Sequence, residues 1–258
     1  MPEGDTIHHA AGRIRPVLEG RVPEEIRTPQ RRHAMDRWAE LLAERSVRTV
    51  EAYGKHLLLR FEGDLVLHSH LGMTGAWAVY DNGQRWRQAA SRAWLVVRCA
   101  GREVVQFGGP TLELLSERRA RTDPRLACLG PDILGQRFDE PAALRRLRGA
   151  DSDRSVGDAL LDQRALAGIG NIWKSESCFA AGIDPWRAVG ETSDSELLEI
   201  VRFARREMRI SADAGFAARP RAVYRRAGEP CPRCSARVLA RGQGDQNRRT
   251  YWCPGCQR

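Results

Sequence analysis

The chain has 258 residues, of which 42% are hydrophobic and 29% charged, with a formal net charge of +9 and an isoelectric point near 9.7. This length and composition suit one or two globular domains and exclude a mainly disordered chain. There is no membrane-length apolar run and no secretory signal pattern, so we expect a location inside the cell. The excess positive charge favours nucleic acid as the partner.

The first five residues, Met1-Pro2-Glu3-Gly4-Asp5, carry an unusual chemical possibility. Removal of Met1 would leave Pro2 as a terminal secondary amine beside a carboxylate, and a terminal amine titrates nearer neutrality than a lysine. The alternative is an ordinary helix start, with proline at the first helical position and glutamate favouring the helix dipole. On these residues alone the ordinary start is preferred.

A helix is predicted after this start, capped by Asp5 or Thr6 and kinked or shortened at Pro16, with Gly20 just past its end. Short β-rich runs separated by glycines follow and predict an antiparallel sandwich or barrel. These runs cover residues 47–53, 56–61, 65–70, 76–80, 93–99 and 103–107.

Helices are predicted again after a polar connection that begins near Arg118. Two of them flank Ala167-Gly-Ile-Gly-Asn171, and a later one begins with the capping box Ser193-x-x-Glu196. The buried face of that later helix is expected to contain Leu197, Ile200, Val201, Ala204 and Met208.

Four cysteines near the end of the chain have the spacing of a zinc ribbon. Cys231-Pro-Arg-Cys234 and Cys253-Pro-Gly-Cys256 supply four thiolates for a closed, structural Zn²⁺ site, one per chain. Two redox pairs are the alternative, but they require a βαβ context that is absent from the pattern. Arg241, Arg248 and Arg249 on the same hairpin would face solvent or phosphate, and Cys99, Cys128 and Cys178 are expected to be reduced and partly buried.

The Gly-x-Gly turn at residues 167–171 joins helix to helix, which is not the context of a dinucleotide-binding loop. Backbone N–H groups in such a turn can hold a phosphate. Simple helix-hairpin geometry explains the glycines equally well.

Five motifs together resemble the formamidopyrimidine-DNA glycosylase and endonuclease VIII family, in order along almost the whole chain. They are Met1–Asp5, Tyr53-Gly-Lys-His-Leu57, His70-Leu-Gly-Met-Thr-Gly75, the block from Leu160 to Glu176, and Arg248-Arg-Thr-Tyr-Trp-Cys-Pro-Gly-Cys-Gln257.

The resemblance implies an α+β protein with an N-terminal antiparallel β-sandwich and flanking helices. A helical domain with a helix-two-turn-helix motif and a zinc-finger β-hairpin would follow. The expected parts are residues 1–117 (catalytic sandwich), 118–150 (connection), 151–225 (helix-two-turn-helix domain) and 226–258 (four-cysteine zinc finger). In this family DNA lies in the cleft between the two domains.

The resemblance also implies a bifunctional DNA glycosylase and abasic-site lyase that nicks the strand by β,δ-elimination. Pro2 is the expected nucleophile, Glu3 the general acid and Lys55 a catalytic phosphate contact. Met73 is the expected wedge into the gap left by a flipped base, although a core position is the alternative. Phe107, Asn171, Lys174 and Arg248 complete the expected DNA contacts.

Departures from the family pattern favour the endonuclease VIII branch, particularly its actinobacterial type. Val105 and Gln106 stand where the guanine-directed branch usually has two arginines, and the stretch 212–224 is short for a loop that closes over 8-oxoguanine. Oxidised pyrimidines are therefore the expected substrates.

Damaged double-stranded DNA is the expected partner, with single-stranded or bubble DNA as further forms, for a monomer in the bacterial cytoplasm at the nucleoid. Two rival classes stay open, a non-catalytic zinc-ribbon protein that binds DNA or recognises damage, and an RNA-binding protein.

Overall fold

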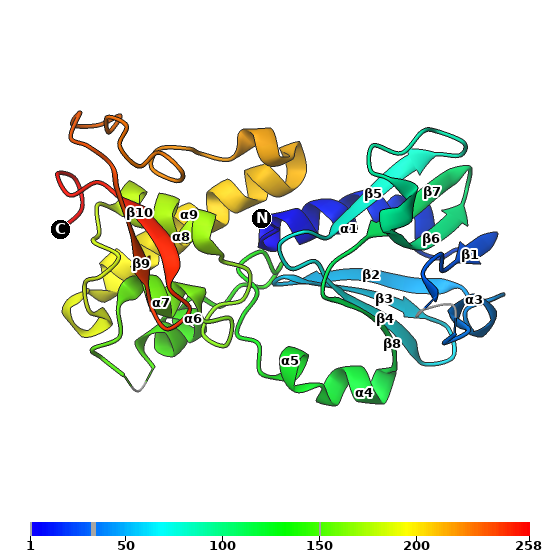
Figure 1. Cartoon of the computed structure of the whole chain (residues 1–258). Helices are drawn as coiled ribbons and strands as arrows, with labels where there is room; N and C mark the ends of the chain where they lie inside the picture. The colour runs from blue at the N-terminus through cyan, green and yellow to red at the C-terminus, as the bar shows by residue number, and fades with distance from the viewer. Residues whose placement is uncertain (1, 32–34, 150) are drawn as a thin grey trace. The chain divides into compact units, whose positions relative to one another are not determined.

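In the computed structural model of the chain, the structure describes residues 2–31, 35–149 and 151–258 (Figure 1). Two compact units are present, one containing Pro2 and Thr6–Ala127, the other Glu3–Asp5 and Cys128–Arg258. Within these described ranges, every helix is too short or too polar to cross a lipid bilayer.

The first unit contains two four-stranded antiparallel sheets (Figure 1). In spatial order one sheet consists of β1 (Glu25–Arg27), β6 (Ala93–Cys99), β7 (Arg102–Phe107) and β5 (Ala76–Asp81). The other consists of β2 (Val47–Tyr53), β3 (His56–Phe61), β4 (Leu65–His70) and β8 (Thr111–Ser116). Six of these strands are predicted by the sequence. The two that are not predicted are β1, which has only three residues, and β8, which lies beyond Gly108 and Gly109 and so after the last predicted β-rich run.

Both sheets and helix α1 (Gly4–Leu18) contribute to one hydrophobic core. The helix buries its predicted apolar face, and the sheets add residues such as Leu59, Leu67 and Val97. Because side chains alternate along a strand, the opposite face of β3, β4 and β8 is left to His56, His68, Glu113 and their neighbours. The first unit is therefore a β-sandwich with a covering helix.

The start of α1 differs from the prediction. The helix begins at Gly4, so Asp5 lies in its first turn and does not cap it. Pro16 does not shorten the helix, which continues to Leu18, because a proline in the last turn removes few helical hydrogen bonds.

Short helices complete the first unit. They are α3 (Trp38–Leu41), the 3₁₀ turn η1 (Ala90–Arg92), α4 (Glu117–Thr122) and α5 (Pro124–Ala127). Ala120 of α4 packs on the polar-facing side of the second sheet against Leu58, Val66 and Leu115.

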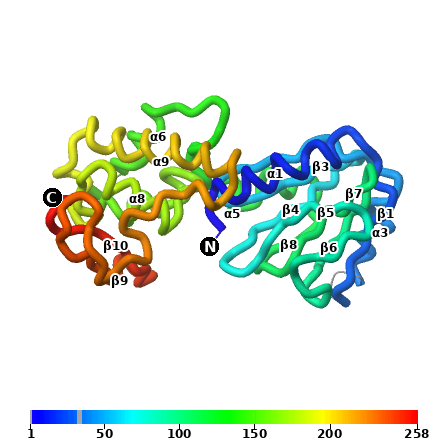
Figure 2. Tube along the Cα trace, turned by 90° about the horizontal axis from the view of Figure 1, so that it is seen from above, coloured from blue at the N-terminus to red at the C-terminus, as the bar shows by residue number. Residues whose placement is uncertain are grey.

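The second unit consists of helices and one hairpin (Figure 2). The helices are α6 (Glu140–Arg148), α7 (Val156–Leu161), α8 (Asn171–Ala181) and α9 (Asp194–Ala214), with 3₁₀ turns η2 (Val189–Glu191) and η3 (Phe216–Ala218). The hairpin pairs β9 (Leu239–Gln243) with β10 (Arg248–Trp252), and β10 lies beside α8. The capping box of α9 and its buried face are confirmed.

Helix α8 is the central element of this unit. Residues 171–179 are all buried, because α7, α9 and the hairpin pack around the helix. A helix buried on every side places its polar residues against other parts of the protein. Two predicted site residues, Asn171 and Lys174, therefore form hydrogen bonds with the hairpin.

Candidate active site and metal centre

The carboxylate of Glu3 lies at the N-terminus of α8. It accepts hydrogen bonds from the backbone N–H groups of Gly170 (3.0 Å) and Ile172 (2.8 Å), with a longer one from Trp173 (3.4 Å). The side chain is 0% exposed. The first N–H groups of a helix have no partner within the helix and carry partial positive charge, so a carboxylate here is stabilised and fixed in direction.

The glycines of the 167–171 turn permit this approach. A Cβ on Gly170 would lie 2.3 Å from Cδ of Glu3, and Gly168 has a φ of +111°. The N–H groups at this turn bind the Glu3 carboxylate, and the glycines leave room for it. The sequence analysis considered phosphate binding and simple helix-hairpin geometry for this turn, but not a contact with Glu3.

The residues after Glu3 are anchored as firmly. The N–H of Gly4 donates to the carbonyl of Gly168 at 2.9 Å, and the Asp5 carboxylate accepts from Ser211 and from two nitrogens of Arg219. Pro2, directly before this segment, is partly exposed, and Met1 lies outside the described residues. An accessible amine at position 2 would therefore lie next to a segment whose position is fixed by several hydrogen bonds.

Sequence reasoning did not identify the partners of Asp5. Ser211 and Arg219 lie more than 200 residues away along the chain, and no local pattern connects them to Asp5. The same holds for Glu176, whose carboxylate accepts from three consecutive N–H groups at residues 222–224 and fixes the segment that leads to the hairpin.

In the first unit, Lys55 and Met73 lie on turns. Lys55 lies in the turn between β2 and β3, where Gly54 has a φ of +55°. Met73 follows β4 and is 76% exposed, so the alternative core position is wrong for this residue.

Phe107 is not at the surface. It is 0% exposed and packs edge-on against the rings of Trp86 and Tyr80 at the end of β7. The predicted DNA contact at this position is therefore corrected to a core role, because a fully buried ring cannot reach a nucleic acid.

Asn171 and Arg248 are brought close together by the pairing of α8 with the hairpin. The Asn171 amide donates to the carbonyl of Arg249 at 2.7 Å, which uses one of its two N–H bonds. Arg248 is exposed on β10, and its Nε donates to Gln246 at 2.8 Å. Arg249 and Arg241 are exposed as well, and the guanidinium of Arg241 also lies 4.3 Å from the centre of the Trp186 ring.

Lys174 is the second corrected DNA contact. It is 0% exposed, and its ammonium donates to Gln243 at 3.2 Å and to Thr250. Burial lowers the pKa of Lys174 to about 8, against an ordinary value near 10.5. The residue connects α8 to the hairpin from inside and has no exposed surface with which to contact a ligand.

Replacing Lys174 by methionine is expected to stabilise the protein at neutral pH. Since the folded-state pKa is depressed, the folded state binds fewer protons than the unfolded state between pH 8 and 10.5, and wild-type stability gains a rising contribution across this window. The buried charge costs on the order of 3 kcal/mol at pH 7, and the variant escapes this cost while Thr250 still donates to Gln243.

The measurement is urea unfolding of both proteins from pH 7 to 10.5. The stability difference should be largest at pH 7 and shrink as pH rises through 8 to 10.5. A difference that stays constant with pH would contradict the buried-charge explanation.

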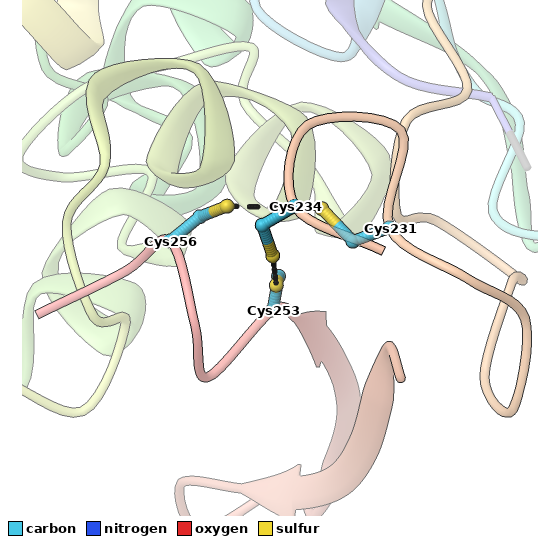
Figure 3. A group of neighbouring side chains, drawn as sticks. All are labelled: Cys231, Cys234, Cys253 and Cys256. Atoms are coloured by element: carbon cyan, nitrogen blue, oxygen red, sulfur yellow. Dashed lines mark hydrogen bonds between the residues drawn. The ribbon is translucent and has the colours of Figure 1, made fainter. Parts of the chain in front are cut away.

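The four predicted cysteine ligands form one cluster (Figure 3). All four sulfur atoms lie within 4.8 Å of one another, with Cys231 and Cys256 sulfurs 3.7 Å apart and Cys234 and Cys253 sulfurs 3.5 Å apart. A tetrahedral site with metal–sulfur bonds of about 2.3 Å requires sulfur spacings of about 3.8 Å, so the cluster fits a metal ion.

The other three cysteines lie apart from this cluster. Cys99 and Cys178 are buried, while Cys128 is exposed, contrary to the expected partial burial.

Comparison with known proteins gives the same classification as the geometry. The model of the formamidopyrimidine-DNA glycosylase N-terminal domain matches residues 1–111, and that of the formamidopyrimidine-DNA glycosylase H2TH domain matches residues 129–215. The chain therefore belongs to the formamidopyrimidine-DNA glycosylase family, and the resemblance drawn from its motifs is confirmed.

Relatives of high identity point to one branch of this family. The chain is 42% identical to a Streptomyces coelicolor protein named "Probable endonuclease 8 2", over 100% of this chain and 94% of the relative. It is 37% identical to a Mycolicibacterium smegmatis protein named as a DNA-(apurinic or apyrimidinic site) lyase, over 100% and 99%.

Among solved structures, a Lactococcus lactis family member crystallised with DNA containing N7-benzyl-Fapy-dG matches with a TM-score of 0.82 and 21% identity. Each chain is covered completely. At this identity the match supports the predicted α+β fold.

Proposed function

We propose that this protein is a bifunctional DNA glycosylase and abasic-site lyase of base excision repair. The observation that carries the proposal is the fixed carboxylate of Glu3, held by the N-terminus of α8 directly after a residue that can become a terminal proline amine. Both groups are needed for excision through a Schiff base, and both lie on the anchored segment at residues 2–5.

In the proposed chemistry, the unprotonated amine of Pro2 attacks C1′ of the damaged nucleotide after Met1 has been removed. Glu3 in its protonated form donates a proton to the sugar ring oxygen as the ring opens, and the proton that the attacking amine loses goes to the departing base, so that a C=N bond replaces the bonds from C1′ to the base and to the ring oxygen. The resulting iminium is permanently charged and withdraws electrons, so β-elimination of the 3′ phosphate and then δ-elimination of the 5′ phosphate follow.

Several residues, of which Met73 and Arg248 are exposed, suit the recognition of an extruded nucleotide. Lys55 would contact a backbone phosphate near the lesion and assist base loss. Asn171, with its second amide N–H, and the exposed Arg248 would hold the flanking phosphates. The exposed Met73 would fill the gap in the base stack. Phosphate contacts of this kind predict binding that weakens as salt increases.

We propose that the cysteine cluster holds one structural Zn²⁺. Four thiolates leave no open position for substrate, and the hairpin region is too small to fold on its own. Val223, Val238 and Phe179 form a small apolar cluster with two of the cysteines, and this cluster joins the hairpin region to α8.

Oxidised pyrimidines are the proposed substrates, removed by a monomer acting on duplex DNA in the bacterial cytoplasm. Val105 and Gln106 of β7 are buried and offer no arginine to read a cytosine opposite the lesion. Relatives named endonuclease 8 at comparable full length support the same branch.

Side-by-side excision from matched duplexes tests the substrate class. Thymine glycol and 5-hydroxycytosine are expected to be removed with a higher kcat/KM than 8-oxoguanine paired with cytosine, because the guanine-directed arginines are absent. An order of preference led by 8-oxoguanine would contradict the assignment.

A further inference from the structure

Gln243 is a buried glutamine at which contacts from four other segments of the second unit meet. It ends β9 and is 4% exposed. Its Nε2 donates to Oγ of Ser155 at 2.9 Å and to the carbonyl of Pro185 at 2.7 Å. Its Oε1 accepts from Nζ of Lys174 at 3.2 Å and from Oγ1 of Thr250 at 2.7 Å. A glutamine amide has two N–H donors and one oxygen with two lone pairs, so all of its hydrogen-bonding positions are used.

The surroundings of Gln243 fit its side chain closely. Ser155 caps α7, and its hydroxyl donates to the Asp158 carboxylate at 2.7 Å, which leaves its lone pairs to accept from the N–H of Asp158 and from Gln243. Gly157 leaves room for the amide, because a Cβ at that position would lie 2.5 Å from Oε1 of Gln243. The glutamine is therefore fixed in position and direction by partners that are themselves fixed.

Arg248 lies directly opposite Gln243 in the pairing of β9 with β10. Opposed residues of an antiparallel pair have Cα atoms about 5 Å apart and side chains on the same face, and Thr250, two residues along β10, shares that face. Gln243 and Thr250 are buried, whereas Arg248 is exposed. The Thr250 hydroxyl that donates to Gln243 also lies 3.4 Å from the carbonyl oxygen of Arg248. The buried amide thus holds the backbone from which the Arg248 guanidinium extends.

The same contacts set the position of β10 against the start of α8. The Asn171 amide donates to the carbonyl of Arg249 at 2.7 Å, and Lys174, about one helical turn further along α8, donates to Gln243. Two donors can bind neighbouring phosphates of one strand only when the distance between them is right. Groups of this kind are usually held in place by hydrogen bonds from buried residues behind them. Gln243 is such a residue behind Arg248.

We propose that Gln243 is a positioning residue for Arg248, which fixes the hairpin on α8 so that Arg248 and Asn171 bind neighbouring phosphates of the damaged strand together. The inference rests on the proposed function, in which these two residues hold the phosphates that flank the extruded nucleotide. Gln243 is buried and acts through Thr250 and the β9–β10 pairing, without touching DNA itself.

A double-mutant cycle with Arg248 tests this role through affinity for a duplex that contains a non-cleavable abasic-site analogue. Arg248→Ala should weaken binding on the order of 10-fold and reduce the slope of log affinity against log salt by about 1, because one phosphate contact is lost. Gln243→Met keeps the side-chain volume without the amide and should weaken binding several-fold, with a similar change in slope. In the Arg248→Ala background it should change affinity by less than about 2-fold. A loss that adds in full to that of Arg248→Ala, or no loss at all, would overturn the proposal.

Thr250→Val and Thr250→Ser test the same link with smaller changes, and they decide the question if Gln243→Met does not fold. Valine keeps the shape of threonine and removes only the hydroxyl that joins Gln243 to β10, whereas serine retains that hydroxyl. Thr250→Val should lower affinity and salt slope as Gln243→Met does, and Thr250→Ser should keep both at wild-type values. Equal affinities and slopes for the two variants would refute the positioning role.

Ser193→Ala is the control for a loss of stability alone. It removes the capping hydroxyl of α9, outside the contacts of Gln243, so urea stability should fall while affinity and salt slope stay at wild-type values. If wild-type protein neither excises bases nor cleaves abasic sites, or if Arg248→Ala leaves affinity unchanged, the proposed function or its contact at Arg248 fails, and the inference with it. If Arg248→Ala weakens binding and Gln243→Met acts independently of it, the positioning inference alone fails.

Discussion

Glu3→Gln is expected to abolish removal of a damaged base while leaving much of the cleavage at a preformed abasic site. The variant retains the shape of the side chain but cannot donate a proton to the sugar ring oxygen. Losing a positioned general acid typically costs about 10²- to 10⁴-fold in rate. Once the base is gone, Schiff-base formation depends mainly on the amine of Pro2.

The structure shows which hydrogen bonds the variant can keep. The N–H groups of Gly170 and Trp173 donate to one oxygen of the Glu3 carboxylate and that of Ile172 donates to the other. A glutamine accepts on one side with its amide oxygen, but its NH₂ group faces an N–H donor on the other, so a smaller loss shared by both activities is expected beside the specific loss of base removal. Single-turnover assays on thymine glycol and abasic duplexes would separate the two steps. Equal loss of both activities would show that Glu3 serves the amine chemistry itself. Glu199→Gln, on the exposed face of α9, is the matched control.

Cys256→Ser is expected to release the proposed Zn²⁺ and to weaken DNA binding by on the order of 10- to 100-fold. The exposed Arg248 lies on the hairpin, and the two Cys-x-x-Cys turns flank this hairpin and bring its two ends together. Without the metal, the apolar cluster of Val223, Val238 and Phe179 and the hydrogen bonds from Asn171 and Lys174 must hold the hairpin region on α8.

Metal content by mass spectrometry of the native protein, together with affinity for an abasic-site duplex at several salt concentrations, measures this effect. The salt dependence should become shallower as phosphate contacts are lost. Cys128→Ser is the control, because Cys128 is exposed and lies outside the cluster. A metal-free Cys256 variant with wild-type affinity would refute the structural role of the site.

Features with a local cause were predicted from the sequence. The strands from β2 to β7 match the short β-rich runs between glycines, and the α9 capping box is complete within four residues. The cysteine spacing is likewise sufficient to predict the cluster, because each Cys-x-x-Cys turn places its own two sulfurs close together.

Features that depend on burial by distant segments were not predictable in this way. From the sequence, Lys174 is expected at the surface, but the hairpin, about 70 residues later in the chain, covers that side of α8. Phe107 is in the core because it packs against Tyr80 of the neighbouring strand β5 and against Trp86 in the loop that follows β5. The hydrogen bonds that join His56 to His68 and His68 to Glu113 likewise require three strands to be in register before these side chains meet.

The measurement that tests the central claim most directly is borohydride trapping of the folded, metal-loaded protein on duplexes that contain an abasic site or thymine glycol. Mass spectrometry of the cross-linked peptide then identifies the attached residue. The proposed function predicts a reduced covalent adduct on the nitrogen of Pro2, which also requires that Met1 has been removed. No adduct on either duplex, or an adduct confined to a lysine, would contradict it.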